Sequence, residues 1–105
     1  MTTKQTFENF DDLVAQAQVP LLVDFYADWC GPCRMIAKVL EQVKQQLKSQ
    51  VQIVKIDTER YPEIASQFQI YALPTLILFH RGQQVERIEG VQPPEALIAK
   101  VQALK

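Results

Sequence analysis

The chain has 105 residues, a length that suits one domain large enough to bury a hydrophobic core. Hydrophobic residues make up 48% of it, which predicts a folded globule rather than a disordered chain. The formal net charge of −1 gives no reason to expect nucleic acid or an anionic membrane as a partner, and the longest apolar runs, such as Leu76–Phe79, are too short to cross a bilayer.

The N-terminal residues, MTTKQTFENFDD, are polar and become acidic along the segment. They lack the apolar core of a secretory signal and the basic bias of a transit peptide. We therefore expect a cytoplasmic protein kept in a reducing compartment. We also expect residues 1–105 to form a single domain and the protein to be a monomer.

Helices and strands are expected to alternate along the chain. In order, the patterns predict a helix over Phe7–Ala17, a strand over Leu21–Ala27, a helix from Cys33 to about Lys48, a strand over Val51–Ile56, a short helix over Pro62–Phe68, strands over Thr75–His80 and Gln84–Glu89, and a last helix that opens at Pro93 or Pro94. The segment before Phe7 leaves room for a short extra strand.

The long middle helix has the clearest pattern, because its apolar residues recur on one stripe at Ile36, Leu40, Val43 and Leu47. Strands separated by helices favour parallel pairing, and the last two strands, joined at Arg81-Gly82, form a hairpin. The fold class is therefore α/β, with a central mixed sheet flanked by helices on both faces.

The two cysteines lie in the motif Trp29-Cys30-Gly31-Pro32-Cys33, between a predicted buried strand and the start of a helix. The first N–H groups of a helix have no internal partner, so they stabilise a thiolate placed there. Pro32 suits the first turn, and Cys33 lies one turn from Cys30, so the two sulfurs can meet. We expect Cys30, at the exposed end, to attack, and Cys33, one turn in and less accessible, to resolve the mixed disulfide.

Such a cysteine pair has two other possible uses. A structural zinc site needs four ligands, whereas the chain has two cysteines and one histidine, His80, which we expect to be a solvated strand-end residue. An inert structural disulfide gains little by closing so short a loop. We expect no metal and no organic cofactor within the chain.

Asp24 and Lys55 are charged residues within otherwise apolar strands. Burying an unpaired charge there costs on the order of several kcal/mol, unless the group is paired with an opposite charge or is neutralised by protonation. Asp24 is therefore either a strand-edge carboxylate that faces solvent or a buried acid–base group behind the cysteines. If the two strands are neighbours, Lys55 lies near Asp24 and moderates its pKa.

Three further features have ordinary structural explanations as well as functional ones. Leu73-Pro74 opens a strand, where a proline is common. Trp29 is either a core residue or a contact surface beside the nucleophile. Gly90-Val91 could be only the turn that leads into the last helix.

Along nearly its full length the chain resembles thioredoxins. The resemblance rests on the run from Val23 to Cys33, on Lys55-Ile56-Asp57, on Leu73-Pro74-Thr75 and on Gly82 and Gly90. The stretches Val54–Pro62 and Ala72–Thr75 are most similar to the y-type thioredoxins of photosynthetic lineages. The resemblance implies the thioredoxin fold and protein-disulfide reduction.

The resemblance also implies a role for each matching residue. Cys30 would be the nucleophile, Cys33 the resolving thiol and Asp24 the buried base, with Lys55 beside Asp24. Pro74 would be cis, and the substrate groove would be lined by Trp29, Gly31, Pro32, Leu73, Pro74, Gly90 and Val91.

Two departures from the family pattern bear on this expectation. Lys38 stands where many members have a helix proline, so we expect a weaker kink. Tyr71-Ala72 replaces small or basic residues before the Leu-Pro-Thr turn, so partner choice could differ there.

We therefore predict a disulfide reductase for protein targets, recycled by a separate ferredoxin- or NADPH-dependent thioredoxin reductase. An oxidant or isomerase of the same superfamily is one alternative, but Gly31-Pro32 replaces the histidine common between their cysteines. A binding module whose redox state hardly matters is another, and a serine at both cysteine positions would distinguish it.

Overall fold

The structure, a computed structural model, describes residues 9–104. The elements are α1 (Phe10–Gln16), β1 (Leu21–Tyr26), α2 (Gly31–Leu47), a 3₁₀ turn at Lys48–Gln50, β2 (Gln52–Asp57), α3 (Pro62–Gln67), β3 (Thr75–His80), β4 (Gln83–Glu89) and α4 (Pro94–Gln102). The predicted order is confirmed. The first helix begins at Phe10 and not at the predicted Phe7, because Asn9 is its N-cap and accepts a hydrogen bond from the N–H of Asp12. The possible extra strand before Phe7 lies outside the described residues.

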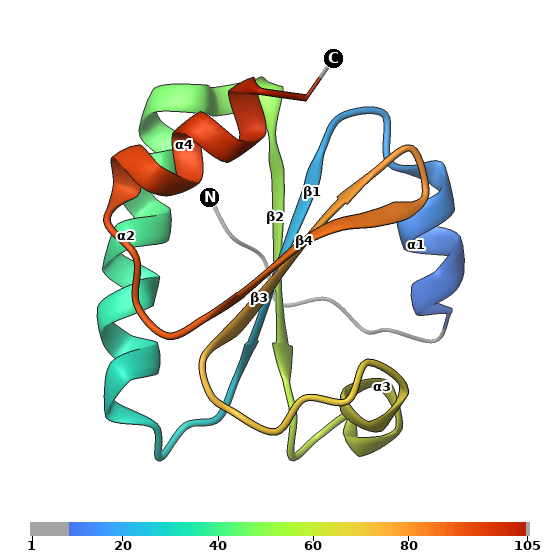
Figure 1. Cartoon of the computed structure of the whole chain (residues 1–105). Helices are drawn as coiled ribbons and strands as arrows, with labels where there is room; N and C mark the ends of the chain where they lie inside the picture. The colour runs from blue at the N-terminus through green and yellow to red at the C-terminus, as the bar shows by residue number, and fades with distance from the viewer. Residues whose placement is uncertain (1–8, 105) are drawn as a thin grey trace.

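The four described strands form one mixed sheet in the order β2-β1-β3-β4. β1 is parallel to β2 and antiparallel to β3, and β3 is antiparallel to β4 (Figure 1). The parallel pair is joined by α2, the crossover helix that parallel strands require. At the hairpin, Arg81 and Gly82 have φ of 54° and 79°, as expected for a two-residue turn.

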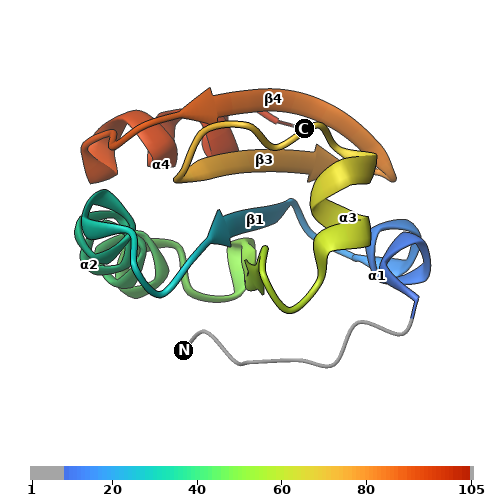
Figure 2. The ribbon, with the colours of Figure 1, turned by 90° about the horizontal axis from the view of Figure 1, so that it is seen from below.

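Helices cover both faces of the sheet, as predicted (Figure 2). On one face, α2 and α4 pack against a cluster that includes Leu22, Leu76 and Leu78. On the other face, α1 and α3 pack against a cluster that includes Val23, Phe25 and Ile77. Because side chains alternate along a strand, Asp24 of β1 lies on the same face as Leu22, which α2 covers.

Helix α2 begins two residues before the predicted start at Cys33, because the side chain of Cys30 caps it. All four residues of the predicted apolar stripe are buried, with exposed fractions of 2% or less at Ile36, Leu40, Val43 and Leu47. The helix is continuous through Lys38.

Three connections meet at one end of the sheet, toward the lower left of Figure 1. They are the β1–α2 turn, the connection from α3 to β3 and the turn from β4 to α4. Their meeting follows from the pairing: Thr75, the first residue of β3, pairs with Phe25 near the end of β1 and with Glu89 at the end of β4. Residues far apart in the sequence therefore surround the cysteines.

Candidate redox-active site

Cys30 and Cys33 form a disulfide at the N-terminus of α2, with their Cα atoms 5.3 Å apart. Cys30 is the N-cap residue, and its Sγ accepts a hydrogen bond from the backbone N–H of Cys33 at 3.2 Å. The 17-residue helix directs its unpaired N–H groups toward this sulfur. A negative charge that develops on Cys30 is stabilised there.

The predicted difference in accessibility between the cysteines is wrong. Cys30 is 4% exposed and Cys33 is 5% exposed. The disulfide holds both residues in one small cluster with Ala27, against which Leu73 also packs. In the oxidised protein, position relative to the helix N–H groups distinguishes the two sulfurs, whereas exposure does not.

Asp24 is completely buried, with an exposed fraction of 0%, so a solvent-facing carboxylate is ruled out. Within residues 9–104, neither of its carboxylate oxygens has a hydrogen-bond partner. Burial raises the pKa of Asp24 from 3.8 to about 7, and the positive charge of Lys55 limits that rise. The carboxyl can therefore gain or lose a proton near neutral pH.

Lys55 lies beside Asp24, as predicted for neighbouring strands, because the two residues are register partners in the parallel β1–β2 pair. Its Nζ lies 4.8 Å from the centre of the Tyr26 ring, a cation–π contact. Burial, with the carboxylates of Asp57 and Asp28 adding to it, raises the pKa of Tyr26.

A hollow of about 140 Å³ lies beside the cysteines. Polar and apolar side chains line it in similar measure, and it is large enough for water. Cys33 and Lys55 both line it. Its full lining is Tyr26, Ala27, Asp28, Cys33, Arg34, Ala37 and Lys55.

The Leu73–Pro74 peptide bond is cis, as the family resemblance implied. The carbonyl oxygen of Pro74 accepts a hydrogen bond from the N–H of Gly90 at 3.0 Å, which brings the β4–α4 turn against it. Gly90 has a φ of 87°, a backbone conformation that favours glycine. Thr75 is buried, and its hydroxyl donates to the carbonyl oxygen of Ala72 at 2.5 Å.

Trp29 is a surface residue, 67% exposed, so a core role is ruled out. Its indole Nε1–H donates to Oε2 of Glu59 at 2.9 Å. Gly31 and Pro32 are also exposed. Val91 is 38% exposed. The predicted groove residues lie on the three connections and, for Gly31 and Pro32, at the first two positions of α2.

Sequence reasoning missed three residues of this region. Glu59 holds Trp29 from 30 positions away, and Tyr26 contacts Lys55 across two strands. Arg34 donates from Nη2 to the carbonyl oxygen of Asp28 at 3.1 Å. The order of the elements offers one clue to Glu59. It lies two residues after the end of β2, and β2 ends beside the end of β1.

Two other observations concern metal and membrane. Among the residues that the structure describes, no three His, Cys, Asp or Glu side chains are grouped to hold a metal ion, and His80 is partly buried at the end of β3. Within the same part of the chain, no helix has the length and apolar character needed to span a membrane.

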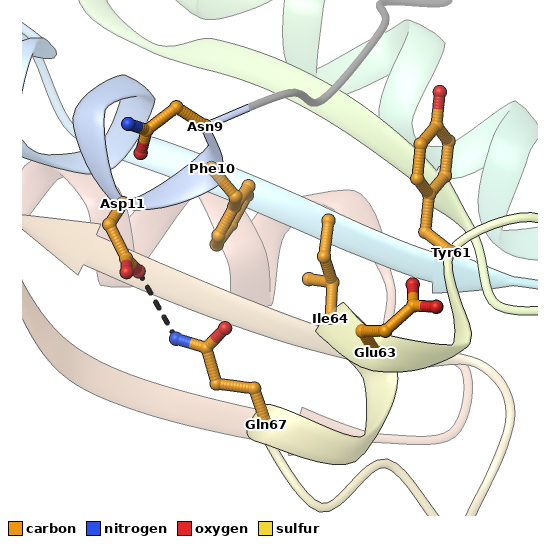
Figure 3. A pocket seen from close by; sticks show the side chains of 7 residues that line it. All are labelled: Asn9, Phe10, Asp11, Tyr61, Glu63, Ile64 and Gln67. Carbon is orange, nitrogen blue, oxygen red and sulfur yellow. Dashed lines mark hydrogen bonds between the residues drawn. The ribbon is translucent and has the colours of Figure 1, made fainter.

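A larger hollow of about 300 Å³ lies between α1 and α3, away from the disulfide (Figure 3). Gln67 of α3 donates to Oδ1 of Asp11 in α1 at 3.1 Å and joins its two sides. The side chains that line it are Asn9, Phe10, Asp11, Tyr61, Glu63, Ile64 and Gln67. Since none of them is a thiol, the redox chemistry lies at the smaller site.

A mixed sheet with helices on both faces, a disulfide at a helix N-terminus, a buried carboxyl and a cis Leu73–Pro74 bond, whose Leu73 packs against the cysteines, together define a dithiol–disulfide oxidoreductase. The thioredoxin family model matches residues 1–103, and the chain belongs to the thioredoxin family.

Individual relatives agree with this assignment. The chain is 55% identical over 102 residues to a thioredoxin-like protein of Synechocystis sp., covering 97% of each. It is 48% identical over 99 residues to the chloroplastic thioredoxin Y2 of Arabidopsis thaliana, covering 94% of this chain and 59% of that longer relative. The oxidised mitochondrial thioredoxin 3 of Saccharomyces cerevisiae superposes with a TM-score of 0.86 at 36% identity, covering 98% of this chain and 95% of that one. The resemblance to y-type thioredoxins is confirmed, and the protein acts by dithiol–disulfide exchange through Cys30 and Cys33.

Proposed function

We propose that the protein reduces disulfides in target proteins, with Cys30 as the nucleophile. The observation that supports this most directly is the N-cap position of Cys30, whose sulfur accepts the N–H of Cys33 at 3.2 Å. That hydrogen bond and the helix N-terminus favour the Cys30 thiolate over the Cys33 thiolate.

The reaction has two thiol exchanges. The Cys30 thiolate attacks one sulfur of the target disulfide, so that a Cys30–target bond forms, the target S–S bond breaks and the first target sulfur leaves as a thiolate. Cys33 then loses its proton and attacks the Cys30 sulfur. The Cys30–Cys33 bond forms, the second target thiolate leaves, and two electrons have passed from the dithiol to the target.

We propose that Asp24 accepts the proton that Cys33 loses before it attacks Cys30. The carboxyl is buried, has a pKa of about 7 and lies on the sheet face that α2 covers. A buried carboxylate with that pKa accepts a proton at neutral pH more readily than an ordinary carboxylate. Lys55 favours the charged carboxylate by limiting the rise in its pKa.

The groove positions the target. An extended segment of the target pairs with the backbone at Leu73, strand to strand, while its disulfide faces Cys30. Exposed side chains supply the contact surface, and Pro74 and Gly90 shape the backbone around it. The residues assigned to substrate binding are Trp29, Gly31, Pro32, Leu73, Pro74, Gly90 and Val91.

In this proposal the whole chain, residues 1–105, works as one monomeric domain in electron transport in the cytoplasm, without nucleic acid or membrane as a partner. Its electrons come from a separate thioredoxin reductase that is ferredoxin- or NADPH-dependent. The dithiol holds two electrons only, so each turnover requires this external donor.

A redox titration of the Cys30/Cys33 couple tests the direction of the reaction. A midpoint below about −220 mV, in the range of cytosolic thiol pools, is expected for a reductase. A midpoint near about −120 mV, typical of a strong oxidant, would overturn the assignment. In a cell that depends on this protein, full function of a Cys30→Ser, Cys33→Ser double variant would instead indicate a binding module.

A further inference from the structure

The connection between α3 and β3, residues 68–74, contains no helix or strand although it carries Leu73 and Pro74. It also presents Tyr71, which is 87% exposed. The segment begins with a turn in which Gln69 has a φ of 53°, in the left-handed region. Contacts outside the segment must therefore select its conformation.

Arg87 of β4 supplies such contacts. Its Nη1 donates to the carbonyl oxygen of Phe68 at 2.6 Å, and its Nη2 donates to the carbonyl oxygen of Gln69 at 2.5 Å. Nε of the same guanidinium lies 3.8 Å from Oε2 of Glu89, which orients the group from the other side. The planar fork of an arginine matches two adjacent carbonyls, whereas a lysine ammonium cannot donate to both in the same geometry.

The other end of the segment is held by the same strand. The N–H of Gly90, just after β4, donates to the carbonyl oxygen of Pro74 at 3.0 Å. Thr75 pairs with Glu89, and the Thr75 hydroxyl holds the carbonyl oxygen of Ala72 at 2.5 Å. Segment 68–74 is thus attached to the end of β4 at its beginning and at its end.

We propose that Arg87 is a positioning residue for the substrate groove: by holding the carbonyl oxygens of Phe68 and Gln69 it keeps segment 68–74 in the conformation that receives a target protein. This inference rests on the proposed role of Leu73 and Pro74 in binding the target. Arg87 touches neither cysteine in the structure, so it acts on recognition and leaves the thiol chemistry alone. Tyr71, on the same segment, is presented to the target in a fixed place.

The test compares Arg87→Gln with Lys100→Gln. Both replace a cation by the same amide, and the Lys100 ammonium pairs with Glu86, the residue beside Arg87 on β4, at 3.5 Å. Each reduced variant is assayed with a protein disulfide, insulin, and with a small one, bis(2-hydroxyethyl) disulfide. Arg87→Gln should raise KM for insulin roughly tenfold and leave kcat unchanged. The increase is smaller than the roughly 100-fold that a misplacement of 1 Å at a reacting group can cost. Its rate with the small disulfide, and both rates of Lys100→Gln, should stay within about twofold of the parent.

Amide hydrogen exchange supplies a readout independent of activity. In Arg87→Gln the amides of residues 69–73 should exchange faster, while the midpoint potential of the cysteine couple is unchanged. Arg87→Lys, which keeps the charge and loses the fork, should give a smaller change in the same direction and serves if Arg87→Gln does not fold.

Two results would overturn the proposal. If stability falls but KM for insulin and exchange at residues 69–73 do not change, Arg87 only stabilises the end of α3, whose C-cap residue is Phe68. If the rates with insulin and with the small disulfide fall together, the damage has reached the cysteines. Failure of the proposed function looks different, because the unsubstituted protein would then reduce neither disulfide.

Discussion

The β1–α2 turn and the α3–β3 connection meet at the same end of the sheet, but they are built in different ways. The first brings the reactive groups from one short run, because Asp24 in β1 is followed within ten residues by Cys30 and Cys33. The second contains no reactive group, and its shape depends on Arg87 and Gly90 of another part of the chain. Thiol reactivity here is a local property of a strand and a helix N-terminus, whereas the target recognition that we propose depends on long-range contacts.

Removing one thiol at a time should have the largest effect on activity, because it removes a reactive group at the β1–α2 turn and leaves the α3–β3 connection unchanged. Cys33→Ser keeps the nucleophile and lacks the resolving thiol, so mixed disulfides with target proteins should accumulate. Cys30→Ser should trap almost none. Non-reducing gels followed by peptide mapping measure both. Equal trapping on Cys33 in the Cys30→Ser variant would reverse the order of attack.

Asp24→Asn should stabilise the oxidised protein at pH 8 and not at pH 4. The folded pKa of Asp24, about 7, lies above its unfolded value of 3.8, so the carboxylate costs nothing below pH 3.8. The cost then grows by about 1.4 kcal/mol per pH unit up to the folded pKa, to roughly 4 kcal/mol. Asparagine removes this cost because it does not ionise. Urea unfolding at both pH values measures the difference; an equal difference at the two pH values would contradict the burial argument.

The same Asp24→Asn variant should turn over more slowly, because Cys33 loses its proton acceptor at the resolving step. The rate of insulin reduction at pH 7 measures this. Asp12→Asn, which changes an exposed carboxylate in α1, is the control and should match the parent. If Asp24→Asn turns over at the parent rate, the base lies elsewhere.

Substituting glycines with positive φ should distinguish an effect on the α3–β3 connection from a loss of stability alone. Gly90 and Gly82 have φ of 87° and 79°, and a Cβ on either would meet open space. Gly90→Ala and Gly82→Ala should therefore each cost about 1 kcal/mol, because alanine is strained in that conformation. Only Gly90→Ala should also raise KM for insulin, since the N–H of Gly90 holds Pro74. Equal KM values for the two variants would show that the β4–α4 turn does not shape the groove.

The smallest effect is expected from Glu59→Ala, which frees the indole of Trp29. Stability should change by no more than about 0.5 kcal/mol, because both partners are exposed. The fluorescence of Trp29, the only tryptophan, should become less polarised. Glu63→Ala, an exposed glutamate of α3, is the matched control. Unchanged polarisation in Glu59→Ala would mean that Trp29 is held by its backbone alone.

The sequence alone determined the element order, the mixed sheet with helices on both faces and the reactive pair. These features follow from periodicity and from short motifs, which act over a few residues. Boundaries moved by up to three residues where a side chain caps a helix: α2 begins at Gly31 because the Cys30 sulfur caps it, and α1 begins at Phe10 because Asn9 caps it.

Only the tertiary structure decided the near-equal burial of the two cysteines, the anchoring of Trp29 by Glu59 and the attachment of segment 68–74 to β4. Glu59 lies 30 positions from Trp29, and Arg87 lies 19 positions from Phe68. No local pattern distinguishes these side chains from other charged residues on a solvated surface. Their partners become visible only from the strand pairing: parallel pairing of β1 with β2 brings Glu59 near Trp29, and antiparallel pairing of β3 with β4 brings Arg87 near the α3–β3 connection.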